Sequence, residues 1–185
     1  MSVNKVKQLL GSYAAHIQVP WRDVAAAQRV IFCVYPEANE LRLRARVEEF
    51  ELATKSAGHG WELFDLTDTF AEWLSSQRYA KSYFTKPHLL ASVLPKYQDF
   101  ILARFQAFLA ERNPSENDVV ALKGVGSLFG FLKVKPVVEQ LSRLVHGRLV
   151  VFFPGSFEDN NYRLLDGYDG WNYLATPITP DKDAS

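Results

Sequence analysis

One glycine-rich turn in the chain follows a predicted strand, a position at which proteins often bind phosphate. It reads KGVGSLFG, from Lys123 to Gly130. A P-loop has the spacing G-x-x-x-x-G-K-[ST], because backbone amides surround the phosphate, the lysine reaches it and the hydroxyl binds magnesium. Here the lysine precedes the glycines, and the spacing is not G-x-G-x-x-G either. A tight turn or a close backbone approach at Gly124 and Gly126 is the simpler interpretation, with phosphate binding as the alternative.

The other polar residues lack the spacing of a known catalytic or metal site. Asp65 and Asp68 follow a predicted strand, where open α/β sheets place catalytic groups, but FDLTDT is not D-x-D-x-T. Ser156 follows FFPG without the G-x-S-x-G elbow of a nucleophile. The four histidines form no zinc motif, and EDNN (158–161) lacks the ligand spacing of a calcium loop. The sequence therefore predicts no catalytic residue, no metal and no cofactor.

Short apolar runs that read as buried strands alternate with amphipathic segments that read as helices. The predicted strands lie in QRVIFCVYP (28–36), GWELFDLTD (60–68), DVVALKGVG (118–126) and RLVVFFPG (148–155). The predicted helices cover residues 4–17, 38–58, 88–111 and 136–144, and one more begins at a capping box in TFAE (69–72). YRLL and WNYLATPI are predicted to pair across DGYDG (166–170), since Asp-Gly is a strong turn signal.

This alternation predicts an α/β fold with a mostly parallel sheet, helices on both faces and a C-terminal hairpin. The 185-residue length indicates a single domain, over residues 1–178, with a flexible tail at 179–185. Hydrophobic residues make up 48% of the chain, which is enough for a sizeable core. Cys33, the only cysteine, lies in an apolar run and is expected to be buried. Neither a secretion signal nor a membrane-length apolar stretch is evident, so we expect a cytoplasmic protein.

The charge balance argues against a dedicated DNA-binding protein. Lys and Arg together number 21, as do Asp and Glu, whereas such proteins carry a basic surplus. Two local basic segments keep a DNA-binding adaptor open as an alternative. One is LKVK (132–135) with Lys123 and Arg148. The other, QRYAKSYFTK (77–86), interleaves aromatic and basic residues as a base-stacking surface would, although a solvated connection with anchoring aromatics is the simpler interpretation.

A set of turns in the C-terminal third resembles a known family. A strand ends in Gly-Val-Gly, a helix follows, and the next strand ends in Phe-Pro-Gly before the D-N-N-Y element at 159–162. The order and spacing of these turns, over residues 124–178, resemble the BrxB family of BREX, a bacterial bacteriophage-exclusion system. The Tyr35-Pro36 strand end and LFDL (63–66) also fit. Many relatives have an aromatic-Arg-Ala-Phe ending soon after D-N-N-Y, where this chain has YRLLDGYDGWNYLATPI.

The resemblance implies a non-enzymatic subunit of a phage-resistance complex that acts as a protein-binding adaptor. Its implied partner is the PglZ-like component, with the BrxC-like ATPase and the PglX-like DNA methyltransferase in a larger assembly. Aromatic and arginine side chains, which are enriched in interface anchors, concentrate beside the D-N-N-Y element. We therefore predict a partner interface at Phe157, Arg163, Tyr168 and Trp171. The alternative from a different class is a degenerate nucleotide- or phosphate-binding protein with weak hydrolase activity.

Overall fold

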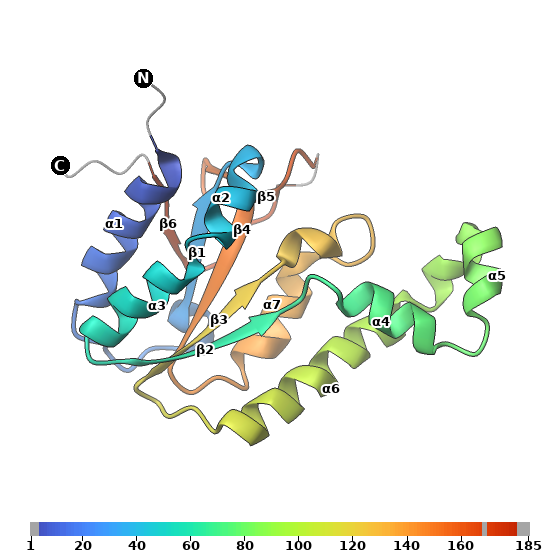
Figure 1. The fold of residues 1–185 in the computed structure, drawn as a ribbon, viewed down its shortest axis with the longest axis horizontal. Coiled ribbons are helices and arrows are strands. Elements are labelled where there is room, and N and C mark those ends of the chain that lie inside the picture. The colour runs from blue at the N-terminus through green and yellow to red at the C-terminus, as the bar shows by residue number, and fades with distance from the viewer. Residues whose placement is uncertain (1–3, 168–169, 181–185) are drawn as a thin grey trace.

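The computed structural model describes residues 4–167 and 170–180, and within these ranges it confirms the predicted α/β fold (Figure 1). The strands are β1 (Val30–Tyr35), β2 (Gly60–Asp65), β3 (Asp118–Lys123), β4 (Arg148–Glu158), β5 (Asn161–Leu164) and β6 (Thr176–Ile178). The α-helices are α1 (Lys5–Ile17), α2 (Glu40–Arg44), α3 (Val47–Ser56), α4 (Thr69–Ser76), α5 (Ala80–Thr85), α6 (Leu94–Arg112) and α7 (Val134–Ser142). Short 3-10 helices cover Ala26–Arg29, Glu37–Asn39, Pro87–Ser92 and Val125–Leu128.

Five strands form one parallel sheet in the order β2-β3-β4-β1-β6. The sheet is buried on both faces, because successive residues of its central strands enter two separate cores. In β4, Leu149, Val151 and Phe153 face one core, while Val150 and Phe152 face the other. A strand that is covered on both faces has a continuous run of apolar residues in its sequence. The positions of these strands could therefore be predicted closely.

The helices divide between the two faces of the sheet. Buried side chains of α1 and α3 join one core, while those of α4, α6 and α7 join the other. Figure 1 shows α1 and α3 on the opposite side of the sheet from α6 and α7. The first helix begins where predicted, because the Asn4 side chain accepts a hydrogen bond from the amide of Lys7. None of the helices in the described chain combines the length and apolar content that a bilayer span needs.

The C-terminal hairpin is present, but its strands are not the predicted pair. β4 continues past the parallel sheet and pairs antiparallel with β5, with Glu158 opposite Asn161. The two turn residues, Asp159 and Asn160, both have positive φ, as a two-residue type I′ turn requires. The EDNN segment is thus a hairpin turn. Across the predicted turn at 166–170, the described residues form only one bridge, between Tyr162 and Trp171, and β6 instead lies parallel to β1.

Three of the predicted helices differ in their bounds, and one of these, predicted over 136–144, is α7 at Val134–Ser142. The segment 38–58 is broken at Ala45 and Arg46 into α2 and α3. The long helix begins at Leu94, after a 3-10 turn, because Pro95 suits the first turn of a helix. The predicted capping box is wrong. Asp68 takes the N-cap position without a side-chain bond, and the Thr69 hydroxyl donates to the Leu66 carbonyl instead.

The connection 77–86 contains α5, a helix that the sequence did not predict, at the far end of the molecule from α1 (Figure 1). The predicted flexible tail lies outside the described residues from position 181 onward.

Candidate functional site

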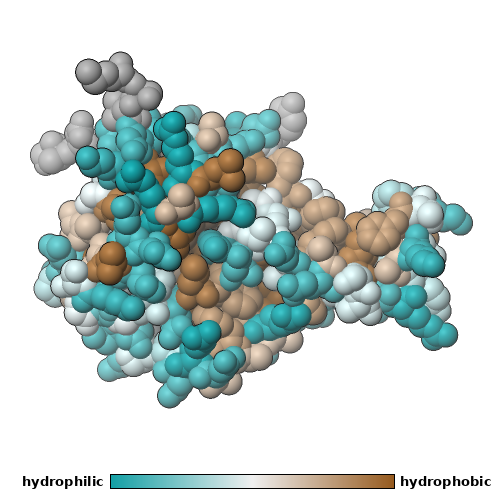
Figure 2. All heavy atoms as spheres, viewed as in Figure 1, coloured by the Kyte–Doolittle hydropathy of each residue, from teal (hydrophilic) through white to brown (hydrophobic). Residues whose placement is uncertain are grey.

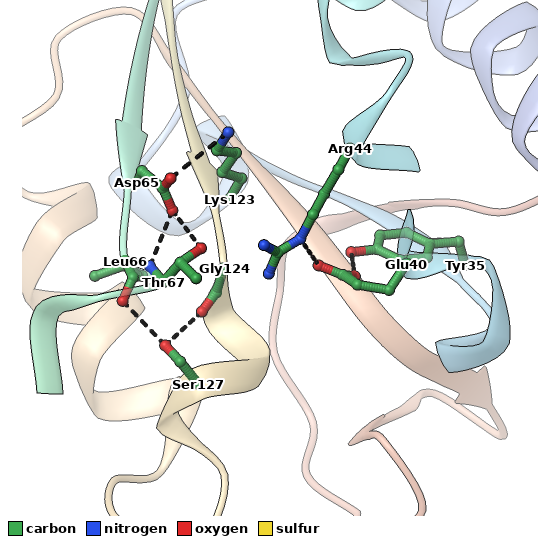
Figure 3. Close-up of polar contacts among 9 residues, drawn as sticks. All are labelled: Tyr35, Glu40, Arg44, Asp65, Leu66, Thr67, Lys123, Gly124 and Ser127. Atoms are coloured by element: carbon green, nitrogen blue, oxygen red, sulfur yellow. Dashed lines mark hydrogen bonds and ion pairs between the residues drawn. The ribbon is translucent and has the colours of Figure 1, made fainter. Parts of the chain in front are cut away.

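The carboxyl edge of the sheet brings together Asp65 and Lys123, two of the polar residues that the sequence analysis considered for chemistry (Figure 3). Asp65, at the end of β2, accepts hydrogen bonds from the Thr67 amide at 2.9 Å and the Thr67 hydroxyl at 2.5 Å. The ammonium nitrogen of Lys123, at the end of the adjacent β3, lies 3.5 Å from the other carboxylate oxygen of Asp65. Partial burial raises the pKa of Asp65, but the Thr67 hydrogen bonds and the Lys123 charge outweigh it, so the pKa lies below its usual value. Asp65 therefore remains an ionised acceptor at neutral pH.

The glycine-rich turn encloses neighbouring chain atoms. Gly124 has φ +82°, and a Cβ there would lie 2.5 Å from the Thr67 hydroxyl and 2.6 Å from its amide nitrogen. The Ser127 hydroxyl has the carbonyl oxygens of Gly124 and Leu66 within 2.7 and 3.0 Å. Gly124 is therefore needed for a close approach between two loops, which agrees with the simpler interpretation of the turn.

A second polar group on the same edge is also paired internally. Glu40 accepts hydrogen bonds from the Tyr35 hydroxyl and, at 2.9 Å, from the Arg44 guanidinium (Figure 3). The Glu40 hydrogen bond, more than any other contact, raises the pKa of Arg44, and the negative charge of Asp65 adds to it. Asp65 and Lys123 therefore pair across adjacent strands, while Glu40 pairs with Arg44 within α2 and links this helix to Tyr35 at the end of β1. Within the described chain, His, Cys, Asp and Glu side chains form no group of three that could hold a metal ion.

Because Thr67 fills the space beside Gly124, a substitution there tests the structural role of the turn. Gly124→Ala is expected to lower the free energy of unfolding by about 2–4 kcal/mol, from left-handed strain plus steric overlap. Gly130→Ala is a matched control, since Gly130 has the same φ of +82° but no atom within 4 Å of the position that a Cβ would take. It should cost only about 1 kcal/mol. Urea unfolding of both variants measures the difference, and equal losses would contradict the packed turn.

A groove of about 760 Å³ lies on another part of the molecule, between the loop before α7 and the hairpin region. We call it the hairpin groove. Its lining residues are Phe129, Gly130, Leu132, Lys133, Val134, Lys135, Pro136, Leu164, Asp166, Gly167, Gly170 and Trp171. Apolar side chains predominate in this set, and Phe129 is 45% exposed. An exposed aromatic ring in an apolar groove is typical of a surface that binds another molecule.

The hairpin groove is built on the core of the protein. Trp171 pairs with Tyr162 of β5 through two backbone hydrogen bonds of 2.7 and 2.9 Å. Its ring packs edge-on against Phe32 and Phe153, with each centroid 5.8 Å away. A Cβ at Gly167 would lie 3.2 Å from the Phe129 ring, so the glycine lets this ring lie against the turn. One side of the groove is thus held by the sheet and the other by the start of α7.

Charged groups border the apolar surface of the hairpin groove. Lys133 and Lys135 lie on the α7 side, and Asp166 lies on the opposite side. Lys133 is the N-cap of α7 and makes no side-chain capping bond. The amides of the first turn therefore lack a side-chain acceptor from the N-cap, and the helix dipole favours a negative group there. The α7 side of the groove is suited to an acidic residue that accompanies apolar ones.

Of the four predicted interface residues, two lie at the hairpin groove. Trp171 lines it, and the exposed Arg163 guanidinium lies 3.9 Å from the Cβ position of Gly170, which also lines it. Phe157 is half-buried against Tyr162, with ring centroids 4.7 Å apart, and is absent from the groove lining. Tyr168 lies outside the described residues.

Sequence reasoning missed the other half of the groove. Phe129 lies in the glycine-rich turn and Leu132 directly after it, and the signal available was the apolar and aromatic content of this glycine-containing loop. The first predicted basic segment does not form as one surface. Lys133 and Lys135 border the groove, but Lys123 pairs with Asp65 at the carboxyl edge of the sheet. Arg148 begins β4 at the opposite edge, where it donates a hydrogen bond of 2.9 Å to the Arg22 carbonyl.

A scan of known protein families gives one match that bears on this region. The family described as BREX protein BrxB matches residues 62–177, which is more than half of the chain. The match spans β2 to β6 and includes every residue that lines the hairpin groove. Neither the curated proteins nor the solved structures contain a significant match.

Proposed function

The chain belongs to the BrxB family and is therefore a component of a BREX phage-resistance system, and we propose that it acts there as a non-enzymatic adaptor that binds the PglZ-like component through the hairpin groove. The observation that carries the proposal is the exposed aromatic and apolar lining of the groove, on the part of the chain that the family match covers. The paired polar groups at the carboxyl edge of the sheet give no comparable support to a catalytic role.

The chemistry of the groove favours a polypeptide segment as its occupant. Phe129, Leu132 and Trp171 offer apolar and aromatic contacts, which supply most of the binding energy of protein interfaces. Lys133 and Lys135 offer positive charge beside them. We therefore expect the PglZ-like component to insert a segment with one or two large apolar side chains followed by an acidic residue.

Co-expression with the PglZ-like component of the same system tests the proposal. The two chains should elute as one complex in size-exclusion chromatography at micromolar concentration, since a standard interface with good anchors gives a Kd at or below this range. The BrxC-like ATPase and the PglX-like methyltransferase, expressed singly with this chain, serve as comparisons. Separate elution of this chain and the PglZ-like component would refute the adaptor role.

A further inference from the structure

Residues 77–93, which contain α5 and the 3-10 helix Pro87–Ser92, form a projection that we call the arm. It extends beyond the ends of α4 and α6, away from the sheet (Figure 1). Tyr83, Leu90 and Val93 are half-buried and anchor the arm to the core that α4 and α6 share. These anchors hold the projection in place and leave its outer side chains in solvent.

Large apolar side chains are exposed on the arm. Phe84 is 68% exposed, Tyr79 is 58% exposed and Leu89 is 41% exposed. Of the aromatic residues in 77–86, only Tyr83 therefore anchors the segment, whereas the simpler interpretation of the sequence predicted this for all of them. Figure 2 shows hydrophobic side chains gathered on the projection among hydrophilic ones. A ring that neither packs in the core nor supports the fold is available for a ligand.

The arm is positively charged although the whole chain is neutral. From Trp73 through Gln98 the sequence contains no Asp or Glu. The cations of this stretch are Arg78, Lys81 and Lys86 on the arm and Lys96 in the first turn of α6, which follows it. Among the described residues, none of these four side chains takes part in an ion pair, whereas Glu72 at the base of the arm is already paired with Arg104 at 3.0 Å. The three lysine charges therefore face solvent without compensation, whereas the Arg78 guanidinium lies over the Tyr79 ring, 5.5 Å from its centroid.

We propose that the arm binds single-stranded nucleic acid, with its cations on the phosphates and the Tyr79 and Phe84 rings on the bases. Stacking of bases on aromatic side chains within a basic surface is how proteins hold single strands without sequence preference. A duplex keeps its bases stacked on each other, so the exposed rings favour a single strand. Lysine is depleted in the cores of protein interfaces, and three of the four cations are lysines, which disfavours a protein partner here.

This inference stands on residues outside the hairpin groove and does not depend on the proposed function. The arm and the groove share no lining residue. Phe84 and Phe129 are thus matched exposed phenylalanines, one on each surface, and each serves as the control for the other.

Fluorescence anisotropy with labelled oligothymidine of roughly 15 nucleotides tests the proposal, since a basic groove with stacking residues covers up to about this length. Oligouridine and a DNA duplex of equal length complete the set. We expect both single strands to bind more tightly than the duplex, with an affinity that falls as salt rises. The tighter of the two single strands then identifies DNA or RNA as the natural source.

Four single variants, each at an exposed position, locate the contact. Phe84→Ala and Tyr79→Ala should each weaken single-strand binding by about fivefold or more. Lys81→Gln should weaken it and reduce its salt dependence, whereas Phe129→Ala should leave it unchanged. Thermal unfolding followed by circular dichroism confirms that each variant is folded.

Three outcomes would overturn the proposal. The first is duplex binding that equals single-strand binding, because the rings would then take no part. The second is an equal affinity of Phe84→Ala and the unchanged chain. The third is binding of polyglutamate as tight as that of oligothymidine, which would identify the arm as a site for an acidic protein.

Discussion

Phe153→Ala is expected to lower the free energy of unfolding by about 3–5 kcal/mol, which is a large share of the roughly 5–15 kcal/mol that stabilises a typical domain. Phe153 is fully buried at the junction of the parallel sheet and the hairpin. Its ring lies 5.4 Å from that of Phe32, 5.8 Å from Trp171 and 5.9 Å from Tyr162. Its removal leaves a cavity among aromatic rings that cannot collapse to fill it.

Urea or thermal unfolding measures this loss, with Phe84→Ala as the control. Phe84 is 68% exposed, so the same deletion there should change stability by less than about 0.5 kcal/mol. The free energy of unfolding of Phe153→Leu should fall between those of Phe153→Ala and Phe84→Ala. If Phe153→Ala were as stable as Phe84→Ala, the hairpin region would not be packed on the sheet as described.

Phe129→Ala is expected to weaken binding of the PglZ-like component by about 30-fold or more, equivalent to roughly 2 kcal/mol. The ring is 45% exposed in the free chain and lies in the hairpin groove, so its contact with a partner is available to be lost. Because it is exposed, its loss should change the free energy of unfolding far less than that of Phe153. Isothermal titration calorimetry with the purified partner measures the affinity.

The arm again provides the matched control. Phe84→Ala removes an equally large exposed ring at a distance from the hairpin groove and should leave the affinity for the PglZ-like component within about twofold, as expected for a residue outside the interface. If both variants bound as the unchanged chain does, the groove would not be the interface. If Phe84→Ala alone lost affinity, the interface would lie on the arm.

The parallel strands were predictable from the sequence because each lies in its own short run of apolar residues. A run such as Val30–Tyr35 is apolar at every position, and a strand buried on both faces requires that pattern. The hairpin was predicted in the wrong place because two turn signals compete. Asp159-Asn160 forms the tight turn, whereas an Asp-Gly pair, such as the one at Asp166, is the stronger turn signal in a sequence.

The hairpin groove was predictable only in part, since it depends on which distant segments the sheet brings together. Trp171 was selected from its aromatic neighbours near the hairpin, and the structure places it in the groove lining. Phe129 lies more than thirty residues earlier in the chain, and the pairing of β4 with both β3 and β5 brings its loop to the hairpin region. Likewise, exposure of Phe84 follows from the projection of the arm, which composition does not encode.

Hydrogen–deuterium exchange of the chain with and without the PglZ-like component tests the central claim most directly. The account predicts slower deuterium uptake on complex formation in peptides that cover residues 129–136 and 161–167, which border the hairpin groove. Peptides from α1 and α3, on the opposite face of the sheet, should exchange at the same rate in both states. A stable complex in which the groove peptides exchange as fast as in the free chain would contradict the account.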